Sequence, residues 1–241
     1  MSENFDQVPG VGTSKTAQFR QILWSADDVQ YVPGGVVVDG SVSRDPGNSN
    51  WEHVLRAGLL LGRVTSSNKY APATLGTLPA AYSDGTATQL TVSPATAVEL
   101  ARRIQAAGGS SFKLTGPAAT GGTVRTAAVT FSAIDTTSGV VTVTALGSGG
   151  LFAAGSLVQP ADGSETIRGI LGEPWGLLVT DPENRDINLD VRCGRLVIGG
   201  KIDQALLIDY PSDPAIEAWI KSQLRVNTGG TFIFRDDFLS P

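Results

Sequence analysis

The sequence has very little of the chemistry from which most active sites are built. Cys193 is the single cysteine and His53 the single histidine in 241 residues. One cysteine cannot close an intrachain disulfide, which fits synthesis in a reducing cytosol, and one cysteine with one histidine cannot form a structural zinc site. Any Ser-His-Asp system would have to use His53, and the chain has no Gly-x-Ser-x-Gly segment. We therefore expect no catalytic residues, no metal and no cofactor, with Cys193 as a buried apolar residue and His53 in a packing or surface role.

Charge and long apolar runs are also scarce. Charged residues make up 17% of the chain, and 23 acidic against 18 basic residues give a net charge of −5. Because nucleic-acid affinity comes largely from Lys and Arg neutralising phosphates, we expect no nucleic-acid partner. The most apolar run, Val54 to Val64, contains Arg56 and Arg63 and is too short to span a bilayer. The first residues lack the basic start and apolar stretch of a signal peptide, so we expect no membrane partner either.

The residues that are abundant favour short strands. Glycine occurs 29 times, while aromatic residues are only 7% of the chain. Glycine supplies the positive φ of tight turns, and β-branched side chains suit a pleated surface. We therefore predict an α+β fold that is mostly β. The expected strands and extended segments are Ile22–Trp24, Val36–Val38, a hairpin within Leu55–Thr65, Lys69–Pro72, Ser111–Thr115, Val124–Ile134, Gly139–Leu146, Ser156–Gln159, Ile167–Leu171, Ile187–Val191, Leu196–Ile198, Ala205–Ile208 and Thr231–Arg235.

Two segments have helical spacing and caps. Ser93 followed by Pro94 is a plausible N-cap with proline at the first helical position, and this helix should end at Gly108. Its Glu99 and Arg103 are spaced as an i,i+4 ion pair. The second helix should begin near Pro214, place Ile216, Trp219, Ile220 and Leu224 on one face, and carry a Glu217–Lys221 pair.

Composition changes along the chain indicate three parts. Residues 1–20 are polar and dotted with glycine, which predicts an N-terminal arm. Residues 39–79 and 159–241 should form a main unit, a small β-barrel-like or mixed-sheet core with one C-terminal helix. Residues 80–158 should form an inserted β-rich unit that carries the other helix.

Two separated stretches carry a family resemblance. The first is Leu55-Arg56-Ala57-Gly58-Leu59-Leu60-Leu61-Gly62-Arg63-Val64-Thr65 followed by Lys69-Tyr70-Ala71-Pro72, and the second is Asp162-Gly163-Ser164-Glu165-Thr166-Ile167-Arg168-Gly169-Ile170-Leu171. In this order they resemble the lambda-like head decoration, or capsid cement, proteins of tailed bacteriophages. The later strands near residues 191–205 and the closing helix and strand at residues 216–234 are similar too, whereas residues 80–158 have no counterpart.

The resemblance implies a structural protein of the virion. Members of this family bind the outer surface of the expanded capsid as homotrimers, clasp the major capsid protein and stabilise the shell against internal DNA pressure. The implied location is the outer capsid surface, after synthesis in the host cytoplasm. By analogy with this family the arm would extend over residues 1–38 and contact the capsid, with Phe19, Ile22, Leu23 and Trp24 as its apolar contacts.

Two other classes of protein stay open from the residues alone. A head fibre or host-glycan adhesin would use the 80–158 unit for recognition, and exposed aromatic residues among Tyr82, Phe112 and Phe131 would favour that reading. A small hydrolase with an unfamiliar site would depend on His53. Trp24, Trp51 and Trp175 lie in irregular surroundings and are candidates for interface anchors.

Overall fold

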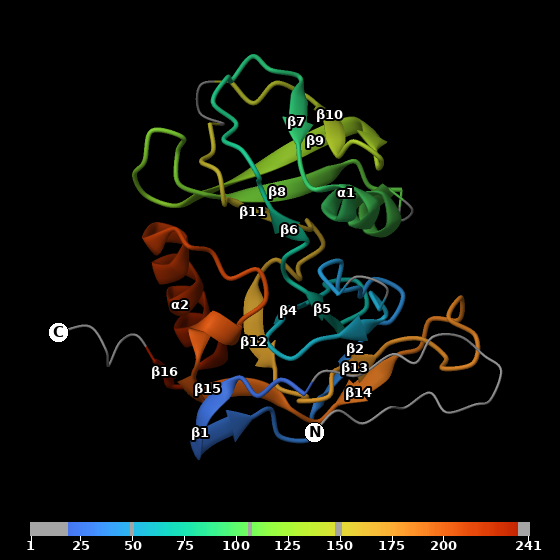
Figure 1. Cartoon of the computed structure of the whole chain (residues 1–241), viewed down its shortest axis with the longest axis vertical. Helices are drawn as coiled ribbons and strands as arrows, with labels where there is room; N and C mark the ends of the chain where they lie inside the picture. The colour runs from blue at the N-terminus through green and yellow to red at the C-terminus, as the bar shows by residue number, and fades with distance from the viewer. Residues whose placement is uncertain (1–18, 49–50, 106–107, 148–150, 236–241) are drawn as a thin grey trace.

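The computed structural model describes residues 19–48, 51–105, 108–147 and 151–235. Within these ranges the chain is α+β and mostly β, as its composition predicts. Two sheets dominate, and Figure 1 shows them one above the other along the long axis of the molecule. In the described residues, no helix is both long and apolar enough to cross a membrane.

The lower sheet has eight strands and is curled (Figure 1). Its order is β1-β15-β12-β4-β5-β2-β14, with β16 also paired to β15. The strands are β1 (Leu23–Tyr31), β2 (Val36–Val38), β4 (Leu60–Arg63), β5 (Tyr70–Pro72), β12 (Ile167–Leu171), β14 (Val191–Cys193), β15 (Leu196–Ile202) and β16 (Phe232–Phe234). Together with helix α2 (Pro214–Thr228), the short 3-10 helix η3 (Gln204–Leu206) and a small pair formed by β3 (Val54–Leu55) and β13 (Leu177–Leu178), this sheet forms the main unit.

The upper sheet has six strands in the order β6-β11-β8-β9-β10-β7. These are β6 (Gly76–Thr77), β7 (Gln89–Thr91), β8 (Ser111–Gly116), β9 (Arg125–Asp135), β10 (Val140–Val143) and β11 (Leu157–Gln159). Helix α1 (Pro94–Leu100) continues directly into a π-helical turn, η1 (Ala101–Gln105). We call this sheet with α1 and η1 the inserted unit. It begins at Gly76 and ends at Gln159, slightly wider than the predicted 80–158, because β6 and β11 join its sheet.

Each unit has its own apolar core. In the inserted unit, Leu100 of α1 and Phe112 of β8 belong to one buried cluster. In the main unit the central strands are buried on both faces, so that Leu60 belongs to a cluster with α2 and its neighbour Leu61 to a cluster on the opposite side. Burial on both faces explains why this strand reads as a continuous leucine run instead of alternating with polar residues.

Local signals placed the helices and one turn correctly. The Ser93 Oγ accepts a hydrogen bond from the Thr96 N–H at 3.0 Å, and Gly229, at φ 69°, follows the last residue of α2. Lys221 and Glu217 form the expected ion pair at 2.8 Å. The predicted hairpin turn lies between β9 and β10, where Gly139 takes φ 77°. These features depend on residues within a few positions of one another.

The described part of the predicted arm belongs to the main sheet. β1 pairs with β15 and β2 pairs with β14, and Ile22 is only 1% exposed. The apolar side chains of this segment are needed to complete the core, so residues 22–38 are not a separate arm. Residues 1–18, the first part of the same prediction, lie outside the described residues.

Three strand predictions are wrong, because residues 187–190 form no strand and β14 begins only at Val191, and because tertiary packing decides the other two. The segment Leu55–Thr65 is not a hairpin, because β3 pairs with β13 while β4 lies between β5 and β12. Residues 205–208 begin as the helix η3 instead of a strand, because the Asp203 carboxylate accepts a hydrogen bond from the Ala205 N–H at 3.2 Å and starts the turn.

Candidate interaction surfaces

The two stretches that carry the family resemblance are hydrogen-bonded neighbours in the main sheet. β4 and β12 are antiparallel, with Gly62 opposite Ile167 and Leu60 opposite Ile170. Just beyond the strands, the Thr65 N–H donates to the Asp162 carbonyl at 2.8 Å. The segments are separated by the whole inserted unit in sequence, and the fold brings them together.

The glycines in these two stretches are where the backbones approach most closely. A Cβ on Gly62 would lie 1.8 Å from the Ser164 carbonyl oxygen. A Cβ on Gly163 would lie 2.1 Å from the Thr65 Oγ1, and Gly163 also has φ 102°. Only glycine fits at both positions without moving the opposite chain. Gly62 and Gly163 are therefore explained by the packing of the two stretches, whereas Gly58 approaches the Leu206 carbonyl oxygen and Gly169 approaches Leu196 and Val197.

The residues predicted as apolar arm contacts divide into two kinds. Ile22 is buried and Leu23 packs against the main core, so these two hold the segment in place. Phe19 and Trp24 are 55% and 43% exposed and lie on the surface. The ring of Phe19 meets the ring of Trp175 edge-on, with centroids 5.0 Å apart, and Trp175 is itself 45% exposed. Exposed aromatic side chains of this kind are typical anchors of protein interfaces.

Backbone contacts fix the start of this aromatic surface. The Arg20 N–H donates to the Pro174 carbonyl at 2.8 Å, and its guanidinium donates to the Leu206 carbonyl from Nε at 2.9 Å. β1 then forms one edge of the main sheet, with register shifts along its pairing with β15. Phe19 and Trp24 are thus presented from an ordered segment at and before the edge strand β1, and Trp175, between β12 and β13, lies against Phe19.

A second surface lies at the opposite edge of the main sheet, where β14 is the last strand in the order. The segment between β13 and β14 folds back on itself: the Leu189 N–H donates to the Val179 carbonyl and the Asp181 N–H to the Ile187 carbonyl. Leu178, Ile187 and Leu189 are exposed on this segment. The predicted strand at residues 187–191 is wrong apart from Val191, the first residue of β14, and the sequence did not indicate that Ile187 and Leu189 are exposed.

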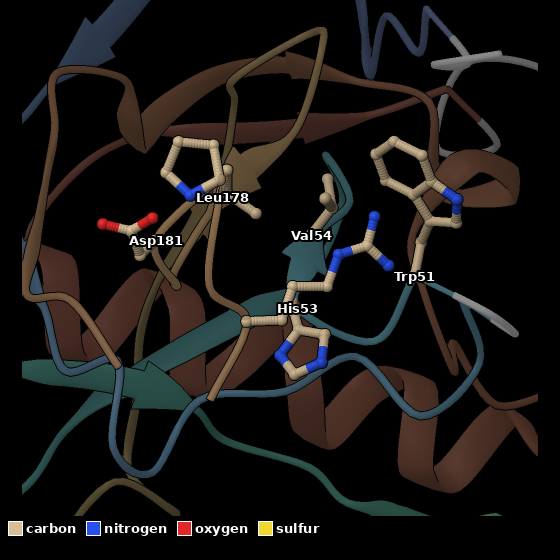
Figure 2. A pocket seen from close by; sticks show the side chains of 7 residues that line it. Trp51, His53, Val54, Leu178 and Asp181 are labelled. Carbon is tan, nitrogen blue, oxygen red and sulfur yellow. The ribbon is translucent and has the colours of Figure 1, made fainter. Parts of the chain in front are cut away.

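The described residues near the only histidine form a small hollow of about 170 Å³. It is lined by Trp51, His53, Val54, Leu178, Asp181, Pro182 and Arg185. Figure 2 shows Trp51 and Asp181 on opposite sides of it. The Arg185 guanidinium lies 5.5 Å from the centre of the Trp51 ring, and the Asp181 carboxylate accepts a hydrogen bond from the Glu183 N–H at 2.8 Å, as a turn cap. The hollow is smaller than the sites that usually bind small molecules.

The described residues around His53 do not form a pair of nucleophile and base. Its Nε2 lies 3.4 Å from a carboxylate oxygen of Glu52, and its Nδ1 is buried without a hydrogen-bond partner among the described residues. Burial and the nearby positive charge of Arg44 lower the pKa of His53, so the ring is neutral at neutral pH. Within the described ranges, no three His, Cys, Asp or Glu side chains come together as a metal site. Cys193 is buried, as predicted.

No family model, no curated protein and no solved structure matches this chain.

Proposed function

We propose that this chain is a capsid decoration protein of a tailed bacteriophage, which binds the outer surface of the expanded shell as a trimer and stabilises it. The observation that carries the proposal is the contact between the two stretches that resemble the decoration family. β4 and β12 are adjacent strands, and a Cβ at Gly62 or at Gly163 would clash with the other stretch. A chance resemblance gives no reason for the two stretches to be neighbours, each with a glycine at a position where the other stretch leaves no room for a side chain.

The aromatic surface supplies a plausible contact with the major capsid protein. Phe19, Trp24 and Trp175 each expose more than two fifths of their surface. A trimer offers three such contacts at once, so modest individual interfaces combine into slow release. A protein that binds only the expanded shell stabilises it by mass action and needs no bond chemistry. The proposed action is therefore binding, without catalysis, cofactor or metal.

The alternative of a head fibre or glycan adhesin receives less support. The inserted unit, which would be its recognition part, contains Tyr82, Phe112, Phe131 and Phe152, and all four side chains are buried in its core. Sugar recognition usually relies on exposed aromatic faces. The described surface of this unit offers none, so we keep the decoration protein as the proposed function.

The first experiment measures the number of copies of this chain per major capsid protein in purified virions of the phage that encodes it, by quantitative mass spectrometry. A ratio near one to one supports a protein that covers the shell. A few copies per particle would instead indicate a fibre or adhesin, and absence from the virion would overturn the proposal.

The second experiment tests the aromatic surface directly. We expect Phe19→Ala with Trp24→Ala to weaken binding to expanded capsids in a pelleting assay by roughly 30-fold or more, the effect of losing one strong anchor. Val226→Ala is the matched control, because Val226 is 75% exposed on α2. Unchanged binding by the double variant would show that the capsid contact lies elsewhere.

A further inference from the structure

The junction between the two units is built around a buried arginine. Arg103, in η1 of the inserted unit, has a side chain that is 1% exposed. Its guanidinium donates to three groups of the main unit: the Pro72 carbonyl at 2.7 Å, the Ser164 Oγ at 2.6 Å and an Asp162 carboxylate oxygen at 3.1 Å. The other Asp162 oxygen accepts from the Ser164 N–H at 3.0 Å, which fixes the carboxylate.

The π-helical turn is what directs Arg103 to the main unit. In an uninterrupted α-helix Arg103 would pair with Glu99, as its spacing predicts, but this pair is absent from the described contacts. Instead Arg102 pairs with Glu99, and the Arg102 Nη1 donates to the Ser41 carbonyl of the main unit at 2.6 Å. The wider turn rotates the following residue away from the helix face. Arg103 is thereby released toward the main unit.

Other contacts also cross the junction: the Gln159 Nε2 donates to the Ala73 and Glu165 carbonyls, each at 3.2 Å. Lys113 of β8 lies 2.5 Å from Glu165 of the main unit, and Leu157 of β11 belongs to the core cluster beneath α2. A buried guanidinium offsets its lost hydration only where its planar donors meet acceptors. Both terminal nitrogens of Arg103 have acceptors, while its Nε has no hydrogen-bond partner among the described residues. Apolar contact tolerates sliding, whereas three acceptors around one planar fork specify one orientation.

We propose that Arg103 is a latch that holds the inserted unit in a single orientation on the main unit. The partner that Arg103 binds, Asp162-Gly163-Ser164, is part of the stretch that resembles the decoration family. The latch itself is independent of the proposed capsid binding, since it concerns contacts within one chain.

The test measures the distance between the two units in the full chain. Spin labels are attached at Ser132→Cys on β9 and Ser222→Cys on α2, both exposed sites, while the buried Cys193 stays unlabelled. We expect one narrow distance distribution by pulsed electron paramagnetic resonance in this background. Arg103→Met should broaden it, with hydrogen-exchange protection retained in both sheets. Arg102→Met is the matched control and should leave the distribution narrow, because Arg102 is a neighbour whose side chain is 27% exposed and makes one bond across the junction.

A second variant removes the acceptors instead of the arginine. In the double variant Asp162→Asn with Ser164→Ala, Arg103 loses its side-chain acceptors but can be hydrated again when the units separate. If Arg103→Met unfolds the chain, this double variant is used to test the latch instead. Broadening, or separate melting of the two units by calorimetry, supports the latch. A narrow distribution with a single melting transition in the variant that folds overturns it.

Discussion

Replacing Gly62 with alanine tests the packing that explains Gly62 and Gly163. Gly62 lies in β4, and its backbone does not need positive φ, so alanine is acceptable to the local chain. The added methyl would lie 1.8 Å from the Ser164 carbonyl oxygen and 2.6 Å from the Thr166 carbonyl oxygen. Ordinary contact begins at 3.4 Å, so one chain must move by at least 3.4 − 1.8 = 1.6 Å. Both clashing atoms are backbone, so no side chain can rotate away.

The loss of stability caused by this clash can be estimated. Overpacking a well-packed site costs about 1–3 kcal/mol, and a clash with backbone in a central strand belongs at the upper end. For a chain of this length, about 3 kcal/mol lowers the melting temperature by roughly 6–12 °C. Circular dichroism melts of the purified variant measure this shift directly.

Gly194→Ala is the matched control for this substitution. A Cβ on Gly194 would have the Glu173 carboxylate oxygen as its nearest neighbour, at 3.8 Å, and Gly194 has no positive φ. We expect its melting temperature to stay within about 2 °C of the unchanged chain, the range of a neutral surface substitution. Equal melting temperatures for Gly62→Ala and Gly194→Ala would refute the proposed contact between the two stretches.

Three further predictions concern single side chains. Burial alone would raise the pKa of the Asp162 carboxyl, but the Arg103 charge and the hydrogen bonds from Ser164 outweigh burial and hold the pKa below its usual value. The ionised carboxylate therefore stabilises the fold fully above about pH 4, where the unfolded carboxyl is also ionised, and this stabilisation is lost as the pH falls through the lower folded pKa. Asp162→Asn should thus destabilise the chain at pH 7 but much less at pH 2, as measured by urea titrations. Burial raises the pKa of the Cys193 thiol to about 11, so a colorimetric disulfide reagent at pH 8 should react with it only after denaturant is added, and fast reaction of the native chain would contradict this burial. Ile220→Ala should lower the free energy of unfolding by about 3 kcal/mol and Trp219→Ala by less, because Ile220 is fully buried and Trp219 only partly; guanidinium titrations that reverse this order would show that the face of α2 is misassigned.

Much of the local structure could be predicted because it depends on neighbouring residues. The N-cap Ser93, the Glu217–Lys221 pair and the positive φ of Gly139 all follow from short-range rules. The helical spacing of α2 likewise predicted the apolar face on which Ile216, Ile220 and Leu224 are buried. The predicted ion pair between Glu99 and Arg103 is wrong, because Arg103 binds Asp162 and Ser164 instead, which lie about sixty residues away in the sequence.

The candidate surfaces were only partly predictable. The sequence singled out Phe19, Ile22, Leu23 and Trp24 as a set, but their division into exposed and buried side chains depends on the pairing of β1 with β15. Likewise the contact between Phe19 and Trp175 joins residues far apart in the chain, for which the sequence carries no spacing signal.

The sequence by itself determined the class of fold, the two helices and the scarcity of groups for catalysis, since these depend on composition and on contacts between near neighbours. The tertiary structure alone decided that β4 lies against β12, that the resembling stretches meet at Gly62 and Gly163, and that Arg103 binds across the junction of the two units. The physical reason is range: hydrogen bonds in turns and helices connect residues a few positions apart, whereas strand pairing and buried charge are settled by whichever distant partner completes the core.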